Sequence, residues 1–200
     1  MSRARRPART GDPHTSPGVG AGRQGAGSAW RENLESLAWA VALALVIRTF
    51  VMAPFKIPSG SMRPTLIEGD RILVNKFLYR FRPPRRGEVI VFRYPDDPKR
   101  PFIKRLAAFG GEQVEIRDGR LLIDGRPVAE GVFGATRYAN QGVYGAEGEV
   151  VTVPEDAFFV LGDNSRSSHD SRFWGFVPKR LLIGRAMVIF WPLPRWRALR

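Results

Sequence analysis

The twelve residues FKIPSGSMRPTL at positions 55–66 mark the point where the character of the chain changes. A long apolar segment ends where they begin, and short segments with alternating apolar residues follow them. Two serines flank Gly60 between Pro58 and Pro64, and proline disfavours a regular helix at both points. The stretch is therefore expected to form a turn that leaves its hydroxyls exposed. Such a turn suits a serine nucleophile, and it equally suits an ordinary loop.

The segment before this turn is apolar over the length of a membrane-spanning helix. From Leu37 to Phe55, only Arg48 and Thr49 are charged or polar. A helix over these residues would be about 28 Å long, close to the hydrocarbon thickness of a bilayer. We predict a single transmembrane helix over residues 32–54. The alternatives are a buried core helix and a cleaved signal peptide, although the end of the segment is a poor small-x-small cleavage site.

The residues before the helix are basic and have almost no large apolar side chains. Residues 1–31 contain six arginines and one aspartate, with many Gly, Ala, Ser and Pro residues. Such a segment cannot bury a core, so it is predicted to be a disordered tail. The positive-inside rule places this tail in the cytoplasm and everything after about residue 54 on the other side of the membrane.

Composition limits the chemistry that the chain can carry. It has 200 residues, which suits one domain plus appendages, and a net charge of +13. That charge indicates an anionic partner, either nucleic acid or phospholipid headgroups. The absence of cysteine excludes a thiol nucleophile and a disulfide framework. His14 and His169 are the only histidines, which excludes a His-rich metal site.

The chain after residue 55 has the pattern of a mainly β fold. Short segments with a period of two are separated by turn signals, and Asp118-Gly119 is a hairpin signal between two of them. We predict a β core over residues 55–112 and 154–197 and a small second β sub-domain over residues 113–153. The predicted strands are 71–75, 89–92, 102–106, 113–117, 121–124, 150–153, 158–161 and 186–191.

A serine nucleophile needs a base, and the sequence offers two candidates. Asp170 follows His169 directly, so on an extended segment the two side chains point to opposite faces, which disfavours a Ser-His-Asp triad. Lys104 lies within an apolar strand, and burial would lower the pKa of its amine. The alternative for Lys104 is a lysine that protects the edge of a sheet. The polar segment 162–172 is either a solvated turn or the wall of an active site.

Three motifs in this order, behind one apolar helix, resemble bacterial signal peptidase I, the membrane-bound Ser-Lys leader peptidase. The family's nucleophile motif is matched here by IPSGSM at 57–62 with PTL at 64–66. The lysine motif is similar to FIKR at 102–105, and the third motif to GDN at 162–164, Ser168 and DSRFWGFVP at 170–178. The resemblance implies a membrane-anchored β-sheet catalytic core that needs no metal and no cofactor.

The resemblance also implies a role for each matched residue. Ser61 corresponds to the nucleophile and Lys104 to the general base. Ser59 corresponds to a side-chain donor of the oxyanion hole, and Ser168 to a hydroxyl that orients the lysine. The residues that correspond to the family's supporting charged residues around the site are Asp163, Arg105, Asp170 and Arg172. The substrate-binding residues correspond to Phe55, Ile57, Pro58, Met62, Leu66, Phe102 and Ile103.

The implied reaction is removal of signal peptides from secretory precursors after a small-x-small sequence. The implied partners are these precursors, membrane phospholipids and a secretion translocon in the vicinity, with no nucleic acid. The implied location is the plasma membrane, with a cytoplasmic amino terminus and an extracytoplasmic catalytic domain. Two alternatives remain, a self-cleaving repressor-type peptidase and a non-enzymatic membrane-anchored β protein. The first would need a DNA-binding helical domain before the core.

Overall fold

The structure is a computed structural model that describes residues 26–46 and 52–199, with side chains described from residue 33 onward in the first range. The chain divides into two compact units, Met1–Val41 and Ala42–Arg200. Most of the predicted tail and residues 47–51 of the predicted transmembrane helix lie outside the described residues.

The first described element is the helix α1, Ala26–Val46. It includes residues 26–31, which were predicted to belong to a disordered tail. Met52–Lys56 forms the strand β1, so the prediction of a helix as far as residue 54 is wrong at its end. A short apolar run cannot be assigned to helix or strand by its composition, and pairing with a neighbouring strand decides the outcome here. Within the described part of the chain, no helix is both long and apolar enough to cross a membrane.

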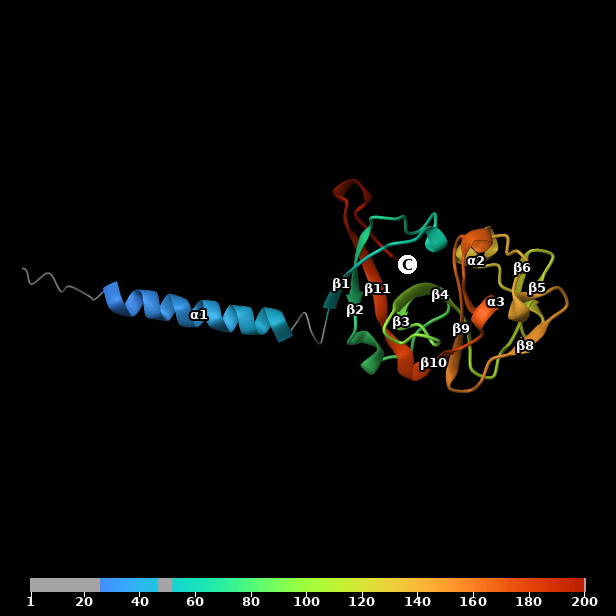
Figure 1. Ribbon diagram of the computed structural model, residues 1–200, viewed down its shortest axis with the longest axis horizontal. Coiled ribbons are helices and arrows are strands. Elements are labelled where there is room, and N and C mark those ends of the chain that lie inside the picture. Colours follow the sequence, from blue (N-terminus) through green and yellow to red (C-terminus); the bar gives the residue numbers. More distant parts are fainter. Residues whose placement is uncertain (1–25, 47–51, 200) are drawn as a thin grey trace, which may run out of the picture. The chain divides into compact units, whose positions relative to one another are not determined.

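The chain after β1 is mainly β, as the period-two pattern predicted (Figure 1). Among its described residues, two short segments form α-helices: α2, Gly131–Ala135, and α3, Ser171–Trp174. The strands are β2 (Arg71–Asn75), β3 (Val89–Arg93), β4 (Pro101–Phe109), β5 (Gln113–Arg117), β6 (Arg120–Ile123), β7 (Arg126–Pro127), β8 (Val150–Thr152), β9 (Ala157–Leu161), β10 (Val177–Pro178), β11 (Leu182–Trp191) and β12 (Arg197–Ala198).

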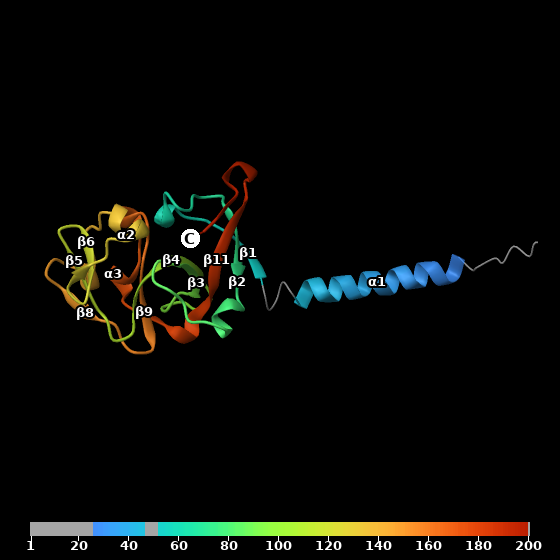
Figure 2. The ribbon, with the colours of Figure 1, turned by 180° about the vertical axis from the view of Figure 1, so that it is seen from behind.

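Within the described residues, the larger sheet has the order β1-β2-β11-β3-β4-β9-β10, and β12 pairs with β11. Neighbouring strands run antiparallel throughout, and the long strand β11 joins the first half of the sheet to the second (Figure 2). β4 pairs with β3 from Pro101 to Arg105, whereas its pairing with β9 begins only at Arg105. No described strand therefore covers the second edge of residues 101–104.

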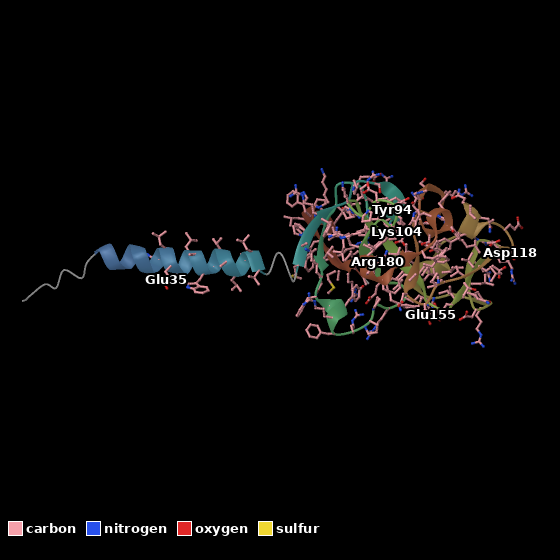
Figure 3. All side chains as sticks on the ribbon, turned by 60° about the horizontal axis from the view of Figure 1, so that its bottom comes forward. Glu35, Tyr94, Lys104, Asp118, Glu155 and Arg180 are labelled. Carbon is pink, nitrogen blue, oxygen red and sulfur yellow. The ribbon has the colours of Figure 1, made fainter. Side chains whose placement is uncertain are left out.

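The smaller sheet has the order β7-β6-β5-β8. The hairpin predicted at Asp118-Gly119 is confirmed, because β5 and β6 pair across it and both residues have positive φ, 52° and 74°. Figure 3 shows Asp118 at the tip of this hairpin and Lys104 inside the β body. Side chains of β5 and β6 share one hydrophobic cluster with Ala107 of β4 and Phe159 of β9. This cluster packs the small sheet against the strands that carry the site.

Candidate active site

The proposed nucleophile lies in a single turn of 3-10 helix, Gly60–Met62. Met62 and Leu66 are both 0% exposed and belong to a core cluster with Ile72 and Val74 of β2. Their burial holds the turn against the sheet. Met62 and Leu66 were expected to line pockets for the substrate, but the structure places them in the core beneath the turn. The sequence does not distinguish an apolar residue that lines a substrate pocket from one that is buried in the core.

A second segment fixes the backbone of this turn from the opposite side. The Asn164 backbone N–H donates to the Ser61 carbonyl at 3.1 Å, and the Asn164 side-chain amide donates to the Gly60 carbonyl at 3.1 Å. A Cβ on Gly162 would lie 2.5 Å from the Ser61 carbonyl oxygen and 2.0 Å from Ser168 Oγ. The chain after β9 therefore passes so close to the nucleophile turn that only glycine fits.

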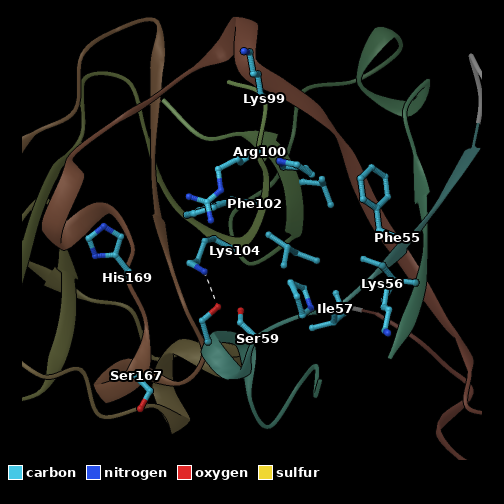
Figure 4. Close-up of a pocket in the computed structure, with 16 residues that line it drawn as sticks. Phe55, Lys56, Ile57, Ser59, Lys99, Arg100, Phe102, Lys104, Ser167 and His169 are labelled. Carbon is cyan, nitrogen blue, oxygen red and sulfur yellow. Dashed lines mark hydrogen bonds between the residues drawn. The ribbon is translucent and has the colours of Figure 1, made fainter. Parts of the chain in front are cut away.

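Lys104 of β4 reaches the hydroxyl of Ser61 (Figure 4). Its Nζ lies 2.7 Å from Ser61 Oγ, although the two residues are far apart in sequence. Lys104 is 4% exposed and Ser61 is 7% exposed, so water has little access to the pair. Nζ also lies 5.6 Å from the centre of the Phe102 ring, two residues earlier on β4. The geometry is that of a hydroxyl nucleophile beside an amine base.

Burial makes this amine a usable base near neutral pH. It lowers the pKa of Lys104 to about 8, because the charged form loses hydration; Asp170 and Asp163 oppose the shift and Arg172 assists it. A lowered pKa means that the neutral amine gains population as pH rises through about 8. At a free lysine, the same fraction would be reached only about two pH units higher.

Each of the two carboxylates near Lys104 is paired with a buried arginine. Arg105 donates from Nε and Nη2 to the carboxylate of Asp163 at 2.7 and 2.6 Å. Arg172 donates from Nε and Nη2 to Asp170 at 2.8 and 2.9 Å, and both side chains are 0% exposed. Asp170 also accepts from the Gly162 backbone N–H at 2.9 Å. The ion pairs thus position the segment that contacts the nucleophile turn.

The two accessory serines have different surroundings. Ser59 is exposed and lies beside the Ser61–Lys104 pair (Figure 4). Ser168 is 4% exposed, and its Oγ has no hydrogen-bond partner among the described residues. Its expected hydrogen bond to Lys104 is therefore not formed in this structure. The contact of Ser168 with Gly162 nevertheless places its hydroxyl close to the backbone of Ser61.

A groove of about 530 Å³ opens at the Ser61–Lys104 pair. Five of the predicted substrate-binding residues line it: Phe55, Ile57, Pro58, Phe102 and Ile103. Several other residues that line it were not predicted from the sequence: Lys56, Ile72, Val91, Lys99, Arg100 and Ser167. Arg100 was detectable, because alternation along a strand places it on the same face as Phe102 and Lys104. Asn164 belongs to the third motif, but its hydrogen bonds to the nucleophile turn could not be predicted, because that turn is far away in sequence.

His169 also lines the groove, but it does not act on the serine in this structure. Its exposed ring lies 5.0 Å from the ring of Phe173. Within the described residues, no hydrogen bond joins it to Ser61. The neighbour of His169, Asp170, points away into the buried pair with Arg172. Among the described residues, His169 and Asp170 therefore do not form a Ser-His-Asp triad with Ser61.

Comparison with known proteins identifies the family. The sequence model described as "Signal peptidase, peptidase S26" matches residues 30–191. A protein of Leptolyngbya laminosa named signal peptidase I is 43% identical over 92% of this chain and 91% of its own length. A probable signal peptidase I-2 of Synechocystis sp. is 42% identical over 83% of this chain and 75% of its own length. A signal peptidase I of Pseudomonas fluorescens is 36% identical over 76% of this chain and 70% of its own length. The chain therefore belongs to the signal peptidase family, peptidase S26, as a serine endopeptidase of the signal peptidase I type.

Proposed function

We propose that the chain cleaves signal peptides from precursor proteins with Ser61 as nucleophile and Lys104 as general base. The observation that carries this proposal is the 2.7 Å contact between Lys104 Nζ and Ser61 Oγ in a buried setting. The neutral amine takes the hydroxyl proton as Oγ attacks the scissile carbonyl, and then donates it to the leaving amine. Ser59 Oγ and the Ser61 backbone N–H stabilise the oxyanion.

The substrate binds as an extended strand along the uncovered edge of residues 101–104. Backbone hydrogen bonds along such an edge recognise any extended peptide, so specificity must come from the side-chain pockets. Phe55, Ile57, Phe102 and Ile103 make the groove apolar next to the Ser61–Lys104 pair. Pockets built from these large side chains select small residues by excluding bulk, which supports cleavage after small-x-small sequences.

A test of this function uses one leader peptide with two residues at the cleavage position. The full-length protein in detergent should cut the peptide that has Ala there. It should cut the peptide with Phe at that position at least about 100-fold more slowly. The bulky side chain does not fit the pocket, so the scissile carbonyl is displaced from Ser61 Oγ. The single-turnover cleavage rate of both peptides is the measurement. Equal rates for the two peptides would contradict the assignment of the pockets.

We further propose that the amino-terminal segment anchors the enzyme in the membrane, with residues 1–31 in the cytoplasm and the β fold outside. The residues that support this are exposed large apolar side chains of α1: Leu34, Leu37, Trp39, Val41, Leu43, Leu45 and Val46. A helix that presents apolar side chains on several faces suits lipid better than water. The exposed Arg80, Phe81 and Arg85 suit anionic headgroups, and a location near a secretion translocon would supply precursors.

Protease added to intact spheroplasts tests this orientation. It should digest residues after about 54 and leave the amino-terminal tail intact, because the bilayer protects the cytoplasmic side. Antibodies against each end of the chain would follow the two parts separately. Loss of the tail while the β fold survives would reverse the proposed topology.

A further inference from the structure

The far end of the groove carries positive charge that the proposed mechanism does not use. Lys99 and Arg100 line the groove and are exposed, and Lys56 of β1 also lines it. Figure 4 shows Lys104, Phe102, Arg100 and Lys99 following one another away from Ser59. No acidic residue is among the described residues that line the groove.

The carboxylates nearest in sequence accept hydrogen bonds from groups other than the Lys99 ammonium and the Arg100 guanidinium. Asp96 accepts a hydrogen bond from the Tyr94 hydroxyl at 2.7 Å, and Asp97 accepts from the Lys99 backbone N–H at 3.3 Å. Neither of them lines the groove. Within the described residues, no salt bridge joins a carboxylate to the Lys99 ammonium or the Arg100 guanidinium. Both cations are therefore available to a ligand in the groove.

The backbone fixes how far these cations lie from the reaction. The Tyr94 backbone N–H donates to the Arg100 carbonyl at 2.9 Å, so the β3–β4 ladder continues one residue beyond Pro101. At about 3.3 Å per residue, Arg100 lies about 13 Å along the strand from Lys104. An extended substrate beside this strand advances by about one residue for each residue of β4. Arg100 and Lys99 thus meet substrate residues about four and five positions from the cleaved bond.

The same geometry tells which side of the cleaved bond they meet. Phe102 and Ile103, which line the groove where small residues are selected, lie between Lys104 and Arg100. Under the proposed function, these pockets hold the small residues of the leader just before the cleaved bond. The substrate residues that reach Arg100 and Lys99 then belong to the leader, upstream of the small-x-small sequence.

We propose that Lys99 and Arg100 determine specificity, favouring precursors with an acidic residue about four to five positions before the cleaved bond and disfavouring those with a basic residue there. This inference rests on the proposed function. Opposite charges at an exposed site attract weakly, like charges repel, and salt screens both effects. The effect is therefore a graded preference among substrates that all carry the small-x-small sequence.

The test compares three leader peptides that differ only at the fifth residue before the cleaved bond, which is Asp, Asn or Lys. With the full-length protein in phospholipid-free detergent at low salt, kcat/KM should be about tenfold higher for Asp than for Lys. The double variant Lys99→Gln/Arg100→Gln should bring this ratio close to one. The variant Lys99→Glu/Arg100→Glu should invert the preference, which a misfolded protein cannot do.

A matched control removes one lysine and one arginine charge at a surface site outside the groove. Lys179 and Arg180 are an exposed Lys-Arg pair that does not line the groove, so Lys179→Gln/Arg180→Gln should keep the wild-type ratio and rates. Adding 0.5 M salt should bring the wild-type ratio of kcat/KM for the Asp and Lys peptides closer to one. Cleavage of all three peptides at equal rates by the wild-type protein overturns this inference alone, whereas cleavage of none overturns the proposed function as well. An unchanged ratio in the groove variants, with weaker binding to phosphatidylglycerol vesicles, would assign the cations to lipid and overturn the inference.

Discussion

Replacement of Lys104 by arginine is expected to inactivate the enzyme as completely as replacement by alanine. Arginine keeps the positive charge, but its guanidinium does not lose a proton near neutral pH, so it cannot accept the proton of Ser61. Ser61→Ala should be equally inactive, because nucleophile and base act as one unit. Each of the three variants should lower kcat by about 10³-fold or more. His169→Ala should keep most of the activity, since its exposed ring makes no hydrogen bond to Ser61 among the described residues.

The pH profile of the wild-type enzyme belongs to the same prediction. Burial lowers the pKa of Lys104 to about 8, so the neutral amine is the minor form below that pH and the major form above it. The single-turnover rate should rise with pH through about 8 and then level off. Rates for the wild type and the four variants, measured on one leader peptide, provide the check. An active Lys104→Arg enzyme, or a folded His169→Ala enzyme without activity, would rule out the Ser-Lys pair.

Gly162→Ala is expected to abolish most activity although it replaces neither Ser61 nor Lys104. Its Cβ would lie 2.0 Å from Ser168 Oγ and 2.5 Å from the Ser61 carbonyl oxygen. Ser168 is 4% exposed and the Ser61 carbonyl belongs to the backbone, so neither can move aside cheaply. The nucleophile turn must shift, and a displacement of about 1 Å at a reacting group lowers the rate about 100-fold. Single-turnover cleavage combined with thermal unfolding measures this effect.

Gly125→Ala is the control for this variant. Gly125 has a positive φ of 74°, and nothing lies within 4 Å of the Cβ that alanine would add. The control should lose about 1 kcal/mol of stability through backbone strain and keep its cleavage rate. A Gly162→Ala enzyme that cleaves as fast as the control would show that the close approach at Ser61 has no role in placing the nucleophile.

The strands of the β fold could be predicted because their information is local. Alternation of apolar residues located β2 and β5 with their observed bounds, and Asp118-Gly119 located the hairpin between β5 and β6. The end of the apolar amino-terminal segment could not be predicted. Residues 52–54 are as apolar as a helix in a membrane would be, and only their pairing with Val74 and its neighbours makes them a strand.

The site was predictable only in part, for a related reason. Motifs identified Ser61 and Lys104, and the structure brings their side chains together at 2.7 Å. Motifs could not show that Ile57 and Ile103 line the groove whereas Met62 does not, although Ile57 and Met62 belong to the same core cluster. The direction of an apolar side chain in an irregular turn depends on tertiary packing. The two hydrogen bonds from Asn164 depend on a contact between segments about 100 residues apart, which no local pattern encodes.

The uncovered edge of residues 101–104 affects which other polypeptide chains can pair with the enzyme. An open strand edge invites a second copy of the protein to add its own edge and extend the sheet. Here Pro101 begins β4 and Pro54 lies in the edge strand β1, and proline offers no N–H to such a ladder. Pairing with β9 closes the edge again at Arg105, so the opening is only four residues long. We expect such a short opening to admit a single unfolded chain and to exclude the edge of a folded sheet, so that a precursor is cut in its extended leader while its folded portion is spared.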